Sequence, residues 1–387
     1  MNLNLKFGGG GERALLQYIK NLPADFTATI IETDYWDKVR LTNEEIASFI
    51  GATTVITISS LESHLRKIRK NDIFLALSEL IFNPIYLSLY VKFNPSLRKV
   101  LNEFDVVYLF SNGYASLFSF NDRPLIIGST HGMSVRGRLK SLEFFFKVML
   151  KLIKINMIFR RIDGFHVLRP FYQQNDLFNR KFDFLLPNGV DTKVFAPNPE
   201  LKHDNVRINF IFVGRLEKSK GVDLLINGWK IFLSKVNRPE YYTLHIVGTG
   251  SAEKSFEGLR NTILHGVVHT MELAKLYKES DIFLFPSTGE IYPMVILEAL
   301  ASGLYVLCSS AVNGVFHQFV ELGSLKYIHM ESNGFAEDML QTISIVPSIR
   351  AITAKTVDII KKQFDWKLIT SILYDEIKNA VKERKLR

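Results

Sequence analysis

Short apolar runs recur along the chain, each bounded by polar or turn-forming residues, and longer helical patterns lie between most of them. Runs of this kind are typical of strands buried on both faces of a parallel sheet. Their alternation with helices indicates an α/β protein with parallel sheets. The predicted strands are Asn4–Phe7, Thr27–Ile31, Val55–Ser59, Asp105–Phe110, Pro124–Gly128, Gly164–Leu168, Phe182–Leu186, Asn209–Val213, Leu244–Val247, Thr262–Leu264, Ile282–Phe285, Tyr305–Cys308 and Lys326–His329.

A turn signal, Pro187-Asn188-Gly189, lies near the middle of the chain. The length of 387 residues is more than one ordinary core needs and indicates two domains. We place the link between two similar α/β domains at this turn. The only cysteine, Cys308, excludes an internal disulfide and lies in an apolar run, which indicates an inert core thiol. The first residues are too short an apolar segment for a signal peptide.

The stretch from Asp281 to Gly303 predicts a strand, a turn and a helix that starts at Pro293. It carries two glutamates, Glu290 in the turn and Glu298 among apolar helix residues. In open α/β sheets, ligands bind beyond the carboxyl ends of the strands, where this turn lies. The glutamates accept hydrogen bonds from ligand hydroxyls, or else Glu290 caps the helix and Glu298 reaches solvent. The stretch by itself leaves both interpretations open.

Basic residues follow another predicted strand, Asn209–Val213. Arg215 and Lys220 both fall beyond its carboxyl end. Two fixed cations there could neutralise a diphosphate leaving group without a metal. The alternative is that both are solvated loop charges, the usual state of Lys and Arg. Neither a two-histidine zinc motif nor an Asp-x-Asp motif or a cysteine pair occurs, so we expect no metal site.

Two further candidates lie in the first half. The run Gly8-Gly9-Gly10-Gly11 precedes a predicted helix, Glu12–Leu22, and glycines there let a diphosphate approach the backbone. Arg13 stands where a dinucleotide fingerprint needs glycine, which disfavours such a site. His131 follows the strand Pro124–Gly128 and could form a hydrogen bond with a substrate. The alternatives are that the glycine run is only a flexible turn and that His131 has a structural role.

The formal net charge is +9, and eleven Lys or Arg against three acidic residues lie between Arg136 and Lys181. Within this span, residues 141–161 mix apolar and basic side chains, a pattern typical of helices that bind anionic membrane surfaces. A core helix with a solvated basic face is the alternative. No nucleic-acid-binding signature is recognisable, so we expect no nucleic-acid partner.

Together these motifs resemble the retaining GT-B glycosyltransferases of family 4, in the family's order and over almost the whole chain. The matching pieces are Gly9-Gly10-Gly11-Glu12, Thr130-His131-Gly132, Pro187-Asn188-Gly189-Val190-Asp191 with Phe195 and Pro197, Val213-Gly214-Arg215-Leu216 with Lys220-Gly221, Pro286-Ser287 with Glu290, Glu298-Ala299 with Gly303, and Phe364-Asp365-Trp366.

The resemblance implies a fold of two facing Rossmann-like domains with a deep cleft between them. An acceptor-binding domain would span 1–187 and a nucleotide-sugar-binding domain 188–362. A C-terminal helix over 363–387 would pack back on the first domain. The sugar would move from the nucleotide sugar to an acceptor hydroxyl with retained configuration, without a metal.

The resemblance also assigns roles toward a donor such as a UDP- or GDP-sugar, with no other cofactor. The diphosphate would be held by Arg215 and Lys220 and approached by the amides of Gly10 and Gly11; Glu298 would bind the ribose, Glu290 and His131 the sugar, and Val267, within Leu264–Val268, the base. The chain departs from the family at Ile291-Tyr292-Pro293, where bulkier residues replace a glycine-rich turn. We expect this turn to affect the choice of donor sugar.

The basic amphipathic segment at 141–161 indicates a lipid-linked glycan or glycolipid acceptor. We therefore expect a cytoplasmic enzyme, peripheral on the inner face of the cell membrane. Two alternatives stay open: a GT-B-like nucleotide-sugar epimerase, which needs no acceptor, and a non-catalytic, membrane-associated GT-B binding protein.

Overall fold

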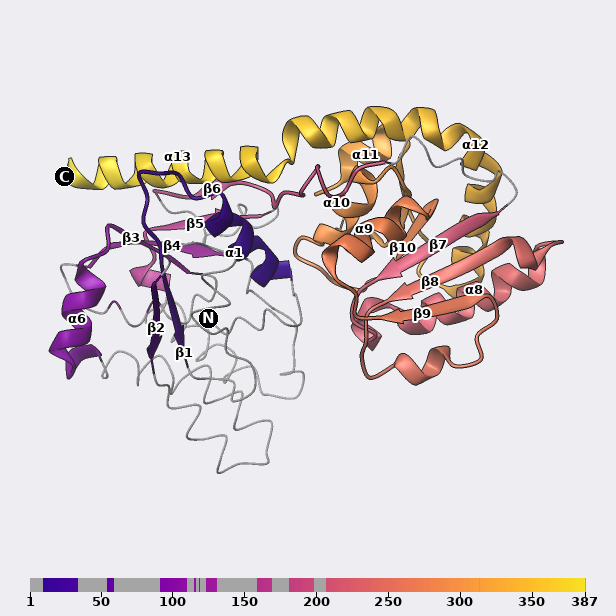
Figure 1. Cartoon of the computed structure of the whole chain (residues 1–387), viewed down its shortest axis with the longest axis horizontal. Helices are drawn as coiled ribbons and strands as arrows, with labels where there is room; N and C mark the ends of the chain where they lie inside the picture. The colour runs from indigo at the N-terminus through magenta and orange to yellow at the C-terminus, as the bar shows by residue number, and fades with distance from the viewer. Residues whose placement is uncertain are drawn as a thin grey trace, which may run out of the picture. The chain divides into compact units, whose positions relative to one another are not determined.

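The computed structural model describes residues 10–33, 54–58, 91–109, 115, 118, 123–130, 159–168, 181–197, 207–312 and 314–386 (Figure 1). The chain divides into two compact units. The first contains Met1–Pro187 together with Thr370–Arg387, and the second contains Asn188–Ile369. Among the described residues, no helix is both long and apolar enough to cross a membrane.

The second unit is built on a six-stranded sheet whose paired strands all run parallel. In space the order is β12-β11-β10-β7-β8-β9. Numbered from β7 within the unit, this is the doubly wound order 6-5-4-1-2-3, and the winding reverses between β7 and β10. The bounds are β7 Ile208–Val213, β8 Tyr242–Val247, β9 Thr262–Gly266, β10 Ile282–Phe285, β11 Tyr305–Cys308 and β12 Leu325–Tyr327.

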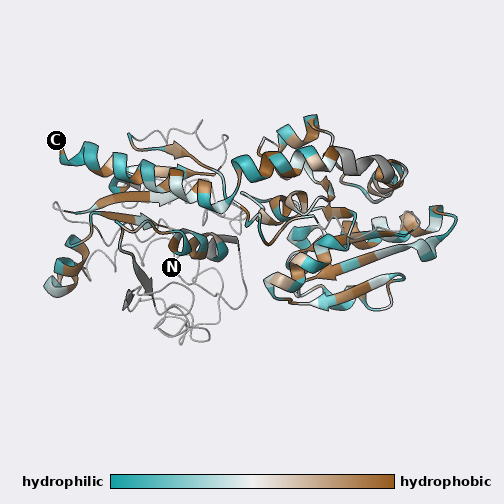
Figure 2. Ribbon diagram, turned by 45° about the horizontal axis from the view of Figure 1, so that its top comes forward, coloured by the Kyte–Doolittle hydropathy of each residue, from teal (hydrophilic) through white to brown (hydrophobic). Residues whose placement is uncertain are grey.

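Helices lie on both sides of this sheet (Figure 1). Because side chains alternate along a strand, β10 faces two cores. Ile282 and Leu284 pack in the cluster that contains Trp229, while Phe283 meets Tyr277 edge-on with ring centroids 5.9 Å apart. The helices of the unit are α8 Val222–Lys235, α9 Thr270–Lys278, α10 Met294–Ala301, α11 His317–Glu321 and α12 Ser332–Gln363. Apolar residues, drawn brown, occupy much of the strands, and the helices carry both apolar and polar stretches (Figure 2).

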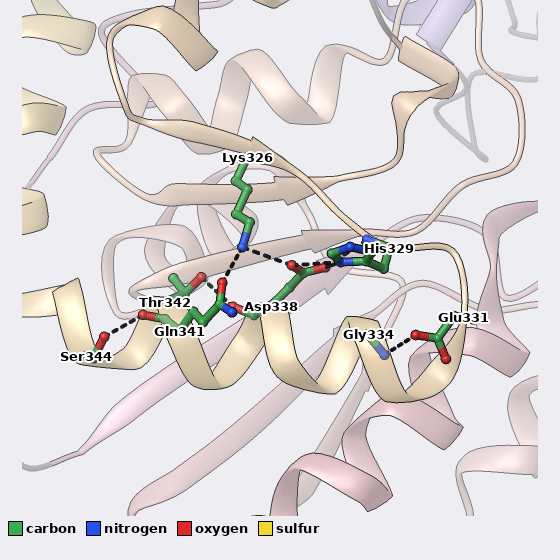
Figure 3. A network of polar contacts seen from close by, with 8 residues as sticks. All are labelled: Lys326, His329, Glu331, Gly334, Asp338, Gln341, Thr342 and Ser344. Atoms are coloured by element: carbon green, nitrogen blue, oxygen red, sulfur yellow. Dashed lines mark hydrogen bonds and ion pairs between the residues drawn. The ribbon is translucent and has the colours of Figure 1, made fainter.

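A polar network joins the edge strand β12 to α12 (Figure 3). The carboxylate of Asp338 is 1% exposed and lies 2.9 Å from Nζ of Lys326. It also accepts a hydrogen bond of 2.8 Å from the backbone N–H of His329. A buried charge needs such partners. At the start of α12, Glu331 accepts hydrogen bonds from the N–H groups of Asn333 and Gly334 and caps the helix.

The first unit contains a four-stranded parallel sheet of order β3-β4-β5-β6 and a separate parallel pair, β1-β2. Its strands are β1 Thr29–Thr33, β2 Thr54–Ile58, β3 Val106–Leu109, β4 Leu125–Ser129, β5 Gly164–Val167 and β6 Phe184–Leu185. Within the described residues, its helices are α1 Gly10–Lys20, α6 Pro95–Asn102 and, from Thr370 onward, α13 Trp366–Lys385. Each strand follows its prediction within two residues, and the predicted strand Asn4–Phe7 lies outside the described residues.

The core of this unit contains a buried histidine. His166 lies between the hydroxyl of Tyr108, 2.5 Å from Nδ1, and the carbonyl of Leu186, 2.7 Å from Nε2. Since a carbonyl only accepts, Nε2 carries the proton and Nδ1 accepts from Tyr108. The C-terminal helix is attached to the same core, because the hydroxyl of Tyr374 donates to the carbonyl of Tyr18 over 2.6 Å. His166 therefore has a structural role.

Candidate functional site

The site lies where two loops of the second unit leave the carboxyl ends of β7 and β10. These are the neighbouring strands between which the winding of the sheet reverses. At such a point the two loops lead away to opposite sides of the sheet and leave room for a ligand. The loop after β7 runs from Gly214 to Gly221, and the loop after β10 runs from Pro286 to Pro293.

The two loops are joined closely. The backbone N–H and the hydroxyl of Thr288 donate to the carbonyl of Ser219, over 2.9 and 3.0 Å. The hydroxyl of Ser287 lies 3.2 Å from the same oxygen. Gly221 has a positive φ of 74°, and a Cβ built on it would collide with the carbonyl oxygen of Pro286. Only glycine fits this position without strain, so it lets the two loops form one structural element.

An ion pair between Lys220 and Glu290 crosses this element. Their side chains are 17% and 18% exposed, so the pair is largely shielded from water. Oε1 of Glu290, which faces Nζ of Lys220, also lies 3.2 Å from the hydroxyl of Ser287. The structure thus brings together two residues predicted to bind the donor. It also assigns Ser287 to orient the glutamate, a role that the sequence analysis missed.

Arg215 is placed differently from Lys220. Its side chain is 70% exposed, and its Nη1 lies 2.8 Å from Oε1 of Glu217 in the same loop. Exposed ion pairs of this kind contribute about 0–1 kcal/mol. The two cations predicted to act together therefore have different partners here, one shielded and one at the surface.

Glu298 lies in α10 and is 2% exposed. The alternative that it reaches solvent is therefore wrong. The helix itself follows the prediction: Pro293 precedes its first residue, and Gly303, with a φ of 89°, follows its end. The helix therefore holds a buried carboxylate at the position predicted to accept hydrogen bonds from ligand hydroxyls.

The loops after β8 and β9 continue the same edge of the sheet. Leu216 donates its N–H to the carbonyl of Thr249 over 2.9 Å, and Gly248 donates to Gly266 over 2.7 Å. A Cβ on Gly248 would collide with the carbonyl of Gly214. Beyond Gly266, Val267 is 62% exposed. The residue predicted to contact the base therefore presents an open apolar surface.

The turn Ile291-Tyr292-Pro293, at which the chain departs from the family pattern, contains a buried tyrosine. Tyr292 is 7% exposed, and its ring centroid lies 5.4 Å from that of Phe316. Burial raises the pKa of this phenol above its ordinary value. Within the described part of the chain its hydroxyl has no hydrogen-bond partner. Its ring belongs to the interior of the second unit.

The remaining candidates belong to the first unit. Gly10 and Gly11 form the beginning of α1, which starts two residues before the predicted helix Glu12–Leu22. His131 lies outside the described residues. Two further residues, Ser219 and Thr288, were not predicted. Thr288 stands beside Gly289 after a buried strand, a signal that could have found it, whereas Ser219 acts through its backbone carbonyl, which its residue type does not reveal.

Comparison with sequence families gives one match, over residues 207–344, to the family described as Glycosyl transferases group 1. An uncharacterized 41.2 kDa protein in the cps region of Klebsiella pneumoniae is 34% identical over 109 residues, which cover 28% of this chain and 29% of that protein. D-inositol 3-phosphate glycosyltransferase of Arthrobacter sp. strain FB24 is 24% identical over 222 residues, covering 53% and 52%. The chain thus spans about half or less of the length of these relatives.

Solved structures match the chain over nearly its whole length. Sucrose-phosphate synthase from Thermosynechococcus elongatus is 17% identical with a TM-score of 0.69, covering 96% of this chain and 94% of that one. HepE from Anabaena in complex with UDP is 17% identical with a TM-score of 0.68, covering 96% of both chains. At such identities the likeness concerns the fold. The chain accordingly has the GT-B fold of two Rossmann-like bodies, and residues 207–344 match the Glycosyl transferases group 1 family.

Proposed function

We propose that this chain is a glycosyltransferase that moves a sugar from a nucleotide sugar to an acceptor hydroxyl. The shielded Lys220–Glu290 pair at the switch point of the sheet is the observation that carries this proposal. An ammonium there suits a diphosphate, and a carboxylate suits sugar hydroxyls. The family match over residues 207–344 and the structural neighbour solved in complex with UDP and glucose support it.

Each site residue has a chemical task in the proposed reaction. Lys220 holds the diphosphate and stabilises the charge that grows on it as the glycosidic bond breaks. Arg215, exposed in the same loop, adds a second cation. Glu298 accepts hydrogen bonds from the ribose, and Glu290 from the donor sugar. Gly10 and Gly11 offer backbone amides to the diphosphate, His131 contacts the sugar, and Val267 contacts the base.

We further propose that the enzyme belongs to family 4, retains the configuration of the sugar and needs no metal. In a front-side reaction, the acceptor oxygen attacks the anomeric carbon on the side from which the diphosphate leaves. The acceptor proton passes to the leaving phosphate oxygen, so no protein nucleophile is required. Lys220 steadies that phosphate throughout.

The acceptor we propose is a lipid-linked glycan or glycolipid at the inner face of the cell membrane. The basic and apolar segment at 141–161 supports this proposal through its composition. All but its last three residues lie outside the described part of the chain.

The test begins with a thermal-shift screen of the whole chain against UDP-, GDP- and ADP-sugars, because a ligand of the folded state raises the apparent stability. With the donor found, Lys220→Ala and Glu298→Ala should each lower transfer by roughly 10²-fold or more while the fold remains intact. Lys218→Ala, a change to an exposed lysine two residues from Lys220, should leave transfer unchanged. Sugar interconversion without an acceptor would indicate an epimerase, and wild-type turnover in both site variants would refute the assignment.

A further inference from the structure

Glu290 occupies a position on Lys220 that a donor diphosphate would also require. Its Oε1 faces Nζ of Lys220 and lies 3.2 Å from the hydroxyl of Ser287. Both members of the ion pair are more than four-fifths shielded from water. One ammonium thus has a carboxylate from its own chain as its counter-ion, at the site where the proposed function needs it to bind phosphate.

We propose that Glu290 competes with the nucleoside diphosphate for Lys220 and so promotes release of this product. This inference rests on the proposed function. When a diphosphate binds Lys220, the carboxylate of Glu290 lies beside a second anion in a shielded setting, where like charges repel more strongly than in water. Glu290 therefore weakens the binding of any diphosphate that donates no hydrogen bonds to the displaced carboxylate.

A nucleotide sugar compensates for this repulsion, because its sugar hydroxyls donate hydrogen bonds to the displaced carboxylate. The product diphosphate has lost those hydroxyls to the acceptor. Glu290 then returns to Lys220, and the product leaves. The residue is a positioning residue for Lys220 in this role, and it makes the site discriminate between donor and product.

Arg215 and Glu217 form a comparable pair in the same loop, but theirs is exposed. The side chains are 70% and 36% exposed, against 17% and 18% for Lys220 and Glu290. Water and salt screen the exposed pair, so Glu217 competes only weakly for its cation. Glu217 therefore provides a matched control that removes the same charge from the neighbouring surface.

The experiment measures, by calorimetry on the whole chain, the Kd of UDP, GDP and ADP and of the matching nucleotide sugars. In Glu290→Gln the side chain keeps its shape and loses its charge. We expect the Kd of the diphosphate that binds to fall about tenfold, or ~1.4 kcal/mol, and its inhibition constant to fall in parallel, while the nucleotide sugar gains no affinity and transfer slows. In Glu217→Gln the Kd should change less than about threefold.

Glu290→Asp keeps the charge but shortens the side chain, so we expect an intermediate Kd; it also keeps the test open if Glu290→Gln does not fold. One outcome would overturn the competition and leave the proposed function standing. In it, the wild type binds a diphosphate and Lys220→Ala binds that diphosphate more weakly, but neither Glu290 variant binds it more tightly than the wild type. If no nucleotide binds the wild type, the proposed function fails together with this inference. An equal gain in Glu217→Gln would also overturn the inference, because it would show a general charge effect.

Discussion

Gly221 lies so close to Pro286 that a Cβ on the glycine would collide with the carbonyl oxygen of the proline. The two residues belong to loops that leave neighbouring strands of the sheet. Their approach fixes how the loop that carries Lys220 meets the loop that carries Glu290. The ion pair at the centre of the proposed site depends on this contact between two backbones.

Gly221→Ala should therefore damage both the fold and the site. We expect the free energy of unfolding to fall by roughly 3 kcal/mol, from backbone strain and from the collision with Pro286. Gly258→Ala is the matched control, because Gly258 has a similar φ of 71° and a Cβ added to it would meet nothing within 4 Å. It should lose only about 1 kcal/mol. Urea unfolding measures both, and equal losses would show that the collision is relieved without cost.

Tyr292→Phe should stabilise the protein. Because the buried hydroxyl of Tyr292 has no hydrogen-bond partner in the described structure, removing it should raise the free energy of unfolding by about 1 kcal/mol. Tyr374 is equally buried, at 7% exposed, but its hydroxyl donates to the carbonyl of Tyr18. Tyr374→Phe should therefore lose about 1 kcal/mol. Chemical denaturation of both variants checks the opposite signs, and a destabilised Tyr292→Phe would contradict the prediction.

His245 should make stability depend on pH. It stacks on His265 with ring centroids 5.2 Å apart, and burial, followed by this neighbour, lowers the pKa of His245 from 6.5 to about 4. Between pH 4 and 6.5 this histidine is protonated in the unfolded chain and neutral in the folded one. The neutral His245 therefore contributes its full share of the folding stability above pH 6.5, and this share is lost as the pH falls toward 4. Because His245 is partly exposed, we expect a loss of only about 1–2 kcal/mol.

Urea midpoints at several pH values between about 4 and 7 measure this loss. His245→Gln should flatten the dependence in that window. His317→Gln, a change to an exposed histidine of α11, should leave it as in the wild type. A wild-type slope in His245→Gln would assign the dependence to other groups.

Membrane binding can be tested through the basic segment. Replacing Lys147, Lys151 and Lys154 with glutamate should reduce co-sedimentation with phosphatidylserine vesicles, since each basic residue near an anionic surface contributes about 1 kcal/mol. The matched control makes the same charge change at exposed lysines of the second unit, namely Lys230, Lys254 and Lys361. Binding that is unchanged in the first variant, or equally reduced in the control, would remove the proposed membrane surface.

The sequence was most informative for the buried strands. The bounds of β10 and β11 match their predictions residue for residue, because each apolar run is followed by a turn-forming or polar residue, Pro286 and Ser309 respectively. At β6, Phe182–Leu186 was predicted, and the strand covers only Phe184–Leu185. The alternation of elements predicted the α/β class, and the family resemblance predicted the GT-B arrangement; both predictions are confirmed.

For the candidate site, the sequence named residues but not the contacts between them. Lys220 and Glu290 are 70 positions apart, and they meet because β10 pairs with β7. No local pattern encodes that pairing. Local patterns also predicted the same phosphate-binding role for Arg215 and Lys220. In the structure, Arg215 lies at the surface, whereas Lys220 is shielded and pairs with Glu290.

The division of the chain has a consequence for its synthesis. The first unit includes Thr370–Arg387, where Tyr374 reaches Tyr18 and Arg384 reaches Asp163. A ribosome makes these residues only after it has synthesised the whole second unit. The second unit is continuous and can fold while translation proceeds. The core of the first unit stays incomplete until α13 has been synthesised.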